Sequence, residues 1–150
     1  MNKKIKRIDY KTYKNQFNYL YNRLDNNNKF KVDQIKKHYN FNVYLNINNI
    51  AICCLSRIKY NTIELKSLIS IKKGYGSLLL QYVIKNYSKD YNIILDSFES
   101  NNKFYLKNNF MPYKKDAYNK KYDPLGLNKN KESVIYYKYK GDAIWIHFIF

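Results

Sequence analysis

Residues 64–84 read ELKSLISIKKGYGSLLLQYVI, and this stretch decides the fold. It begins as an alternating, strand-like segment, turns at Gly74 and Gly76, and continues as a helix with one apolar stripe. The stripe consists of Leu79, Leu80, Val83, Ile84 and Tyr87. A glycine turn between a strand and a helix presents backbone N–H groups to which an anionic group can bind. The stretch therefore predicts a strand–turn–helix unit with an anion site, and a tight turn without a ligand is the alternative.

A second strand–helix unit follows, with the sequence YNIILDSFESNNKFYLKNNF over residues 91–110. Tyr91 to Leu95 is a largely apolar strand whose carboxyl end turns polar, which is where open α/β sheets bind ligands. Because a helix connects this strand to the one before the glycines, we expect the two strands to be parallel. Ser100 is the predicted N-cap of the second helix.

Over residues 63–110 the two units together resemble the GNAT family of N-acetyltransferases. Gly74-Tyr75-Gly76, followed by Ser77, is similar to the Q/R-x-x-G-x-G/A turn that holds the CoA pyrophosphate in that family. The segment FYLKNNF at 104–110 is similar to the family's F-Y-x-K-x-G-F stretch, whose tyrosine lies near the thioester sulfur.

This chain departs from the family pattern at three points. The family's Gln or Arg falls at Ile71, so Lys72 or Lys73 would supply the positive charge instead. The link from the strand to the glycines is short. Asn109 replaces the family's glycine, and asparagine also tolerates the left-handed conformation that ends a helix.

The resemblance implies one α/β (α+β-like) domain over residues 1–150, with a mixed central sheet of about six to seven strands flanked by helices. It implies acetyl-CoA as co-substrate, no metal, and direct transfer of the acetyl group to a primary amine. The acetyl-CoA contacts that it implies are Leu68, Ile69, Lys72, Lys73, Gly74, Tyr75, Gly76, Ser77 and Asn101. A main-chain N–H near Leu68 or Ile69 would polarise the thioester carbonyl.

Tyr105 and Glu64 are the predicted catalytic residues. The Tyr105 hydroxyl would assist the leaving thiolate, and Glu64 would take the amine proton through a water molecule. Asp96 and Glu99 are alternative bases, and a solvated surface acid is the alternative for each of the three. For Tyr105 the alternative is a tyrosine that only packs beneath the last strands.

The rest of the chain supplies the remaining predicted elements. Strands are predicted at 5–8, 41–45, 50–56, 62–69 and 133–139, helices at 10–24 and 30–38, and a long loop at 114–131. The strands from 41 to 69 form an antiparallel meander. Residues 141–150 are an apolar extension, for which an added strand or a homodimer contact remains open.

The net charge of +17 and the 18 tyrosines support a second hypothesis. A basic, aromatic-rich surface attracts nucleic acid, so the chain could bind DNA or RNA with a non-catalytic acetyltransferase-like fold. Residues with A/T-rich codons are abundant, so an A/T-biased genome explains the same composition. A third reading retains CoA binding without catalysis.

The two cysteines and the hydropathy pattern bear on location. Cys53 and Cys54 are adjacent in an apolar run, so we predict buried free thiols in a reducing, cytoplasmic compartment. No apolar run is long enough to span a bilayer, and no secretory signal is recognised. The acceptor is expected to be a small-molecule or protein amine. Long-range steering by a strongly cationic chain disfavours polyamines, whereas protein N-termini, lysines near acidic partners and amino sugars carried on nucleotides remain open.

Overall fold

The computed structural model describes residues 4–25 and 42–139. The predicted helix at 30–38 and the apolar extension at 141–150 lie outside the described residues. Within them, seven strands form one sheet in the order β1-β2-β3-β4-β5-β7-β6. The strands are β1 (Ile5–Ile8), β2 (Asn42–Ile47), β3 (Ala51–Lys59), β4 (Thr62–Ser70), β5 (Asn92–Phe98), β6 (Phe110–Asp116) and β7 (Val134–Tyr139).

The strand directions confirm the predicted mixed sheet. The segment from β2 to β4 is an antiparallel meander, and β5 runs parallel to β4. The helix between β4 and β5 makes this parallel pairing possible, because a parallel neighbour needs a crossover connection. β7 lies between β5 and β6 and is antiparallel to both.

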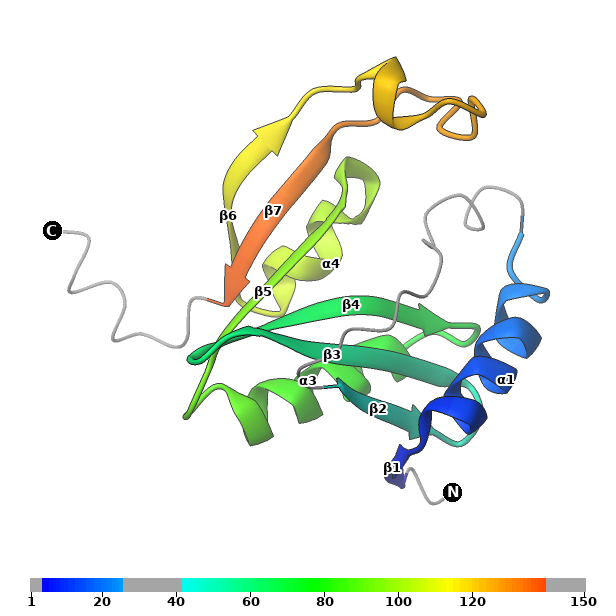
Figure 1. Ribbon diagram of the computed structural model, residues 1–150, viewed down its shortest axis with the longest axis vertical. Helices are drawn as coiled ribbons and strands as arrows, with labels where there is room; N and C mark the ends of the chain where they lie inside the picture. Colours follow the sequence, from blue (N-terminus) through cyan, green and yellow to red (C-terminus); the bar gives the residue numbers. More distant parts are fainter. Residues whose placement is uncertain (1–3, 26–41, 140–150) are drawn as a thin grey trace, which may run out of the picture.

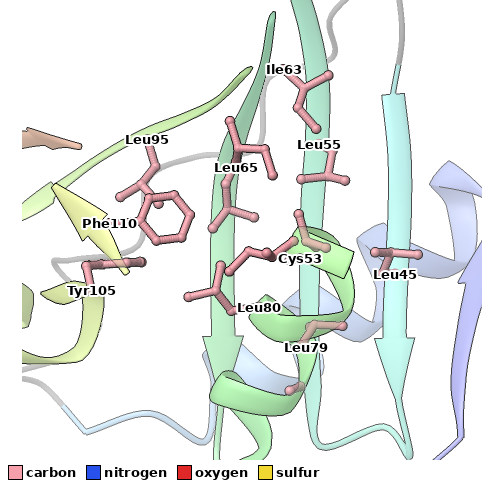
Figure 2. Packing of buried hydrophobic residues seen from close by; sticks show 14 of the residues in the cluster. Leu45, Cys53, Leu55, Ile63, Leu65, Leu79, Leu80, Leu95, Tyr105 and Phe110 are labelled. Carbon is pink, nitrogen blue, oxygen red and sulfur yellow. The ribbon is translucent and has the colours of Figure 1, made fainter. Parts of the chain in front are cut away.

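The helices lie on both faces of the sheet. They are α1 (Tyr10–Tyr21), α3 (Tyr75–Tyr87) and α4 (Asn102–Lys107), with short 3₁₀ turns η1 (Glu99–Asn101) and η2 (Lys120–Tyr122). Side chains on one face of β2, β3 and β4 pack with α3. Among them are Leu45, Cys53, Leu55 and Leu65 (Figure 2). Their neighbours Tyr44, Ile52 and Cys54 pack instead with Tyr13, Phe17 and Leu20 of α1. α1 and α3 therefore cover opposite faces.

Three predicted details are wrong. The first helix ends at Tyr21 rather than Leu24, because the amides of Arg23 and Leu24 make turn-like hydrogen bonds to Leu20 and Tyr21. The predicted loop at 114–131 begins too early, because residues 114–116 belong to β6 and residues 120–122 form η2. Ser100 lies inside η1, and the residue that precedes α4 is Asn101, whose side chain makes no capping hydrogen bond.

The early start of that predicted loop has a physical reason. β6 is an edge strand, and its residues after Phe110 are exposed, so the strand shows no apolar alternation. Its pairing with β7 shifts register between Pro112 and Lys114, which accommodates the proline without a ladder hydrogen bond. Charged and proline-containing edge strands therefore look like loops in the sequence.

The two cysteines are free and buried on opposite faces of β3. Burial raises the pKa of the Cys53 thiol and raises that of Cys54 to about 12. Since the thiolate is the reactive form, we expect neither thiol to react with a chromogenic disulfide reagent in the native protein at pH 8. Both should react in urea. Rapid, stoichiometric labelling of the native protein would contradict the burial of both side chains.

Among the described residues, no helix combines the length and the apolar character needed to cross a bilayer.

Candidate functional site

The central feature of the site is the divergence of β4 from β5. These strands pair only at Thr62–Asn92, Ile63–Ile93 and Glu64–Ile94. Beyond Glu64, β4 continues beside β3 alone, whereas β5 continues beside β7. Figure 1 shows β5, β7 and β6 turning away from the β1–β4 part of the sheet. The sheet is therefore split at its middle.

A β-bulge in β4 explains where the split begins. Leu55 of β3 pairs with Leu65, but Cys54 pairs with Ser67, so Lys66 is an extra residue in β4. Such a bulge bends its strand and increases the local twist. Because Lys66 comes two residues after the last parallel pair, the bend turns β4 away from β5 at that point.

A cavity of about 270 Å³ lies at this split. One wall is residues 65–70 of β4, and the opposite wall is residues 96–98 of β5. Leu24, Asn101, Tyr105 and Val134 complete the lining. Within the described ranges, this stretch of β4 has a ladder partner on its β3 side only. Its other edge can therefore offer backbone N–H and C=O groups to an extended ligand.

Tyr105 lies in the cavity wall, with the side chain only 7% exposed. Its ring contacts Phe104, Phe110 and Tyr137, with centroids 5.0, 6.0 and 5.2 Å away. Burial raises the pKa of the Tyr105 phenol above its usual value, and the side chain of Ser97 acts in the opposite direction. The hydroxyl therefore stays protonated at physiological pH and can donate a hydrogen bond.

Polar residues around Tyr105 are tied to one another. The Asn101 side-chain amide donates to Ser97 Oγ over 2.9 Å, and both residues line the cavity. The Tyr137 hydroxyl donates to Asn102 Oδ1 over 2.7 Å. Asn101 and Tyr105 were predicted as site residues from the sequence, whereas Ser97 was not. Its position at the polar carboxyl end of a buried strand is the signal that could have found it.

The three candidate acids are placed differently. Glu64 does not line the cavity, but its carboxylate lies 3.3 Å from Nζ of Lys66, and Lys66 is a lining residue. Asp96 lines the cavity directly. Glu99 lies outside it, with its carboxylate 2.7 Å from Lys115 Nζ. The cavity itself thus brings Asp96, rather than Glu64 or Glu99, next to Tyr105.

The glycine turn lies where β4 ends. Gly74 precedes α3 with φ +91°, a left-handed conformation that favours glycine. In the described part of the chain, the amides of Gly76 and Ser77 have no backbone acceptor, as expected at a helix start. A Cβ built at Gly76 would lie 3.7 Å from Ser70 Cβ, so the turn adjoins the β4 wall of the cavity.

The remaining predicted cofactor residues are distributed around this turn. Leu68 and Ile69 line the cavity, whereas residues 72–77 lie beyond its lining. Lys72 and Lys73 are exposed, and Lys72 Nζ lies 5.5 Å from the centroid of the buried Tyr75 ring. Asn109, at the end of α4, has φ +67°, which confirms the left-handed conformation inferred for it.

The two glycines of the turn should respond differently to alanine. At Gly74 the positive φ makes alanine unfavourable, so we expect Gly74→Ala to lower the free energy of unfolding by about 1–2 kcal/mol. Gly76 is helical, and a Cβ there would meet only ordinary contacts of 3.6 Å or more. Gly76→Ala is therefore the matched control, with unchanged or higher stability. Urea unfolding of both variants checks this, and equal losses would contradict it.

Comparison with known proteins relies on structure. No protein-family model matches the chain, and no curated protein matches its sequence. An N-acetyltransferase from Staphylococcus aureus Mu50 has a similar structure, with TM-score 0.66, 14% identity, and coverage of 93% of this chain and 97% of that one.

Two further structures are informative. A GNAT family acetyltransferase from Elizabethkingia anophelis, with acetyl-CoA bound, has TM-score 0.55 and 18% identity over 65% of this chain and 74% of that one. A mutant spermidine N-acetyltransferase from Vibrio cholerae has TM-score 0.60 and 13% identity over 90% of this chain and 93% of that one. The split sheet and these similarities together show that the chain has the fold of the GNAT N-acetyltransferases.

Proposed function

We propose that this protein is an acetyl-CoA-dependent N-acetyltransferase that transfers acetyl directly to a primary amine. The observation that carries the proposal is the cavity at the divergence of β4 and β5. On one side it has a β4 edge that pairs with no other strand among residues 4–25 and 42–139. On the other side it has the buried side chain of Tyr105, and a glycine turn lies at the end of its β4 wall.

Each part of acetyl-CoA has a matching feature. The amide-containing arm suits the β4 edge, where main-chain groups can pair with it as a strand would. The pyrophosphate suits the amides of Gly76 and Ser77, with Lys72 and Lys73 nearby. A main-chain N–H near Leu68 or Ile69 would polarise the thioester carbonyl, and Asn101 lies at the opposite wall.

The reaction forms a C–N bond and breaks a C–S bond. The amine must be neutral to attack, so its proton goes to a carboxylate, either Glu64 through a water molecule or Asp96, which lines the cavity. Tyr105 then donates a hydrogen bond to the thiolate that leaves. A phenol with a raised pKa is a weaker acid than a thiol, whose pKa is about 8.5, so Tyr105 stabilises the thiolate without giving up its proton completely.

Calorimetric titration with acetyl-CoA at moderate salt tests the proposal, with ATP as a second polyanion. Saturable binding of acetyl-CoA, little binding of ATP, and CoA release on adding amines are the expected results. Equal, weak binding of both, lost as salt is raised, would mean that the +17 charge alone attracts them. That outcome would favour the nucleic-acid hypothesis, for which steeply salt-dependent DNA or RNA binding is the signature.

A further inference from the structure

Helices α3 and α4 carry the two ends of the proposed acetyl-CoA site. The amides of Gly76 and Ser77 at the start of α3 suit the pyrophosphate, and Tyr105 of α4 lies in the wall of the cavity at the split. One cofactor molecule can engage both places productively only if the two helices keep a fixed relative position. The contacts between α3 and α4 therefore bear on catalysis.

An apolar contact joins the two helices at the start of α3. A Cβ built at Gly76 would lie 3.6 Å from Cζ of Phe104, so this ring packs against the glycine. The Phe104 ring also meets the Tyr105 ring edge to face, with the centroids 5.0 Å apart. Leu80 of α3 lies in the same buried cluster as Tyr105 (Figure 2). Because apolar packing is non-directional, it sets the separation of the helices more than their register.

A polar bridge joins the helices further along α3. Nε2 of Gln81, in α3, donates to Oδ1 of Asn108 over 2.7 Å. Asn108 follows α4 directly, and its Nδ2 donates to the carbonyl oxygen of Phe104, also over 2.7 Å. Asn108 is only 3% exposed although it is polar. Both ends of its side-chain amide are therefore used, one on each helix.

Asn108 also ends α4. Its backbone amide donates to the carbonyl of Tyr105, three residues back, over 3.2 Å, so the last turn is tighter than an α-helical turn. The carbonyl of Phe104, four residues back, is the acceptor that this amide would have in a regular α-helix, and the Asn108 side chain donates to it instead. Asn108 thus binds the main chain of Phe104 and Tyr105 and, through Gln81, the helix α3.

The main chain fixes the polarity of this bridge. A carbonyl oxygen only accepts hydrogen bonds, so Asn108 must present its NH₂ group to Phe104 and its oxygen to α3. The side chain at position 81 must then supply a donor, and that of Gln81 does so. A carboxylate at position 81 would place a second acceptor against the Asn108 oxygen. Rotating the Asn108 amide would only move the conflict to the Phe104 carbonyl.

We propose that Gln81 and Asn108 are positioning residues that hold the Tyr105 hydroxyl in a fixed place relative to the pyrophosphate amides of α3. This proposal rests on the proposed function. Neither side chain lines the cavity at the split, so both act through Tyr105, whose main chain Asn108 binds. A displacement of about 1 Å can cost about 100-fold in rate, so a directional bond between the helices matters to kcat.

Variants at position 81 test the polarity of the bridge. Gln81 is exposed, and Gln, Glu and Lys have similar helix propensities, so these variants should fold alike. Gln81→Glu replaces the donor by an acceptor and should lower kcat by about fivefold or more. Gln81→Lys keeps a donor and should stay within about twofold of the wild type. Glycinamide is the probe amine, and single-turnover CoA release gives the rate.

Asn86→Glu is the matched control for the added charge. Asn86 is also exposed on α3, but its side chain donates over 2.8 Å to the carbonyl of Tyr82 in the same helix. We expect its kcat to equal that of the wild type. A fall in kcat as large as that of Gln81→Glu would assign the effect to charge on α3 and would overturn the positioning role.

The Tyr105→Phe background separates positioning from a general loss of structure. Without the hydroxyl there is nothing left to position, so Gln81→Glu should change kcat in that background by less than about twofold. Urea unfolding of Gln81→Glu, Asn108→Leu and the double variant measures the bridge without turnover. The double variant should lose less stability than the sum of the single losses, because each single change already breaks the same bond.

The outcomes separate the two proposals. An equal fall in kcat in both backgrounds, equal rates for Gln81→Glu and Gln81→Lys, or additive stability losses would each overturn the positioning proposal and leave the acetyltransferase proposal intact. A wild type that neither binds acetyl-CoA nor releases CoA would instead overturn the proposed function. The positioning role would then fall with it, whatever the stability measurements show.

Discussion

Replacing Tyr105 by phenylalanine is expected to lower kcat for acetyl transfer by about 100- to 1,000-fold, the usual effect of removing one donor aimed at developing negative charge. The change deletes only the hydroxyl, and the ring keeps its contacts with Phe104, Phe110 and Tyr137. Binding of acetyl-CoA should change by less than about threefold, because the hydroxyl acts mainly on the leaving thiolate.

The pH dependence sharpens this prediction. Burial raises the pKa of Tyr105, so the phenol is neutral in the folded protein at every pH below the usual phenol value of about 10. The ratio of wild-type to Tyr105→Phe kcat should therefore stay constant between pH 6 and about 9.5. Single-turnover kinetics with a saturating amine measures it. Tyr82→Phe, at a half-buried tyrosine outside the cavity lining, is the control. An unchanged kcat in Tyr105→Phe would remove the role assigned to the hydroxyl.

The sequence predicted the middle of the chain well because the signals there are local. The apolar stripe after Gly76 fixes α3 against the sheet, and the connecting helix makes β4 and β5 parallel. The positive φ of Gly74 and of Asn109 follows from residue types that tolerate it. Each of these features depends on a few neighbouring residues.

Features set by pairing between distant segments could not be predicted. The extra residue at Lys66 is visible only in the register of β4 against β3, yet it determines where the sheet splits. Which acid reaches the cavity depends on that split, so the sequence alone could not separate Glu64 from Asp96. A second cavity, of about 880 Å³, is lined by the β6–β7 connection. Its shape depends on hydrogen bonds of Asp123 and Asn128 within that connection, and in the sequence this segment is recognisable only as a polar loop.

Replacing Leu79 by alanine is the other change with a large expected effect, a loss of about 2–5 kcal/mol in the free energy of unfolding. Leu79 is 0% exposed and lies in the buried cluster with Leu45, Cys53 and Leu80 (Figure 2). Truncation there removes apolar contact and leaves a cavity that the sheet can fill only in part. Domains of this size have only about 5–15 kcal/mol of total stability, so the loss is a large share.

Leu78 gives the matched control within the same helix turn, because it is 38% exposed and belongs to neither buried cluster. Leu78→Ala makes the same chemical change and should stay within about 0.5 kcal/mol of the wild type in urea unfolding. Equal losses in the two variants would show that α3 does not pack on the sheet through Leu79.

The Leu79 variant also connects the core to the proposed cofactor site. α3 carries Gly76 and Ser77 at its start, so the position of their amides depends on how the helix packs. If the packing holds the turn in place, acetyl-CoA at about 100 times its dissociation constant should stabilise the wild type by about 2.7 kcal/mol. The same concentration should stabilise Leu79→Ala by less, because a displaced helix binds the pyrophosphate more weakly. Equal stabilisation of both proteins would mean that the turn keeps its geometry independently of the core.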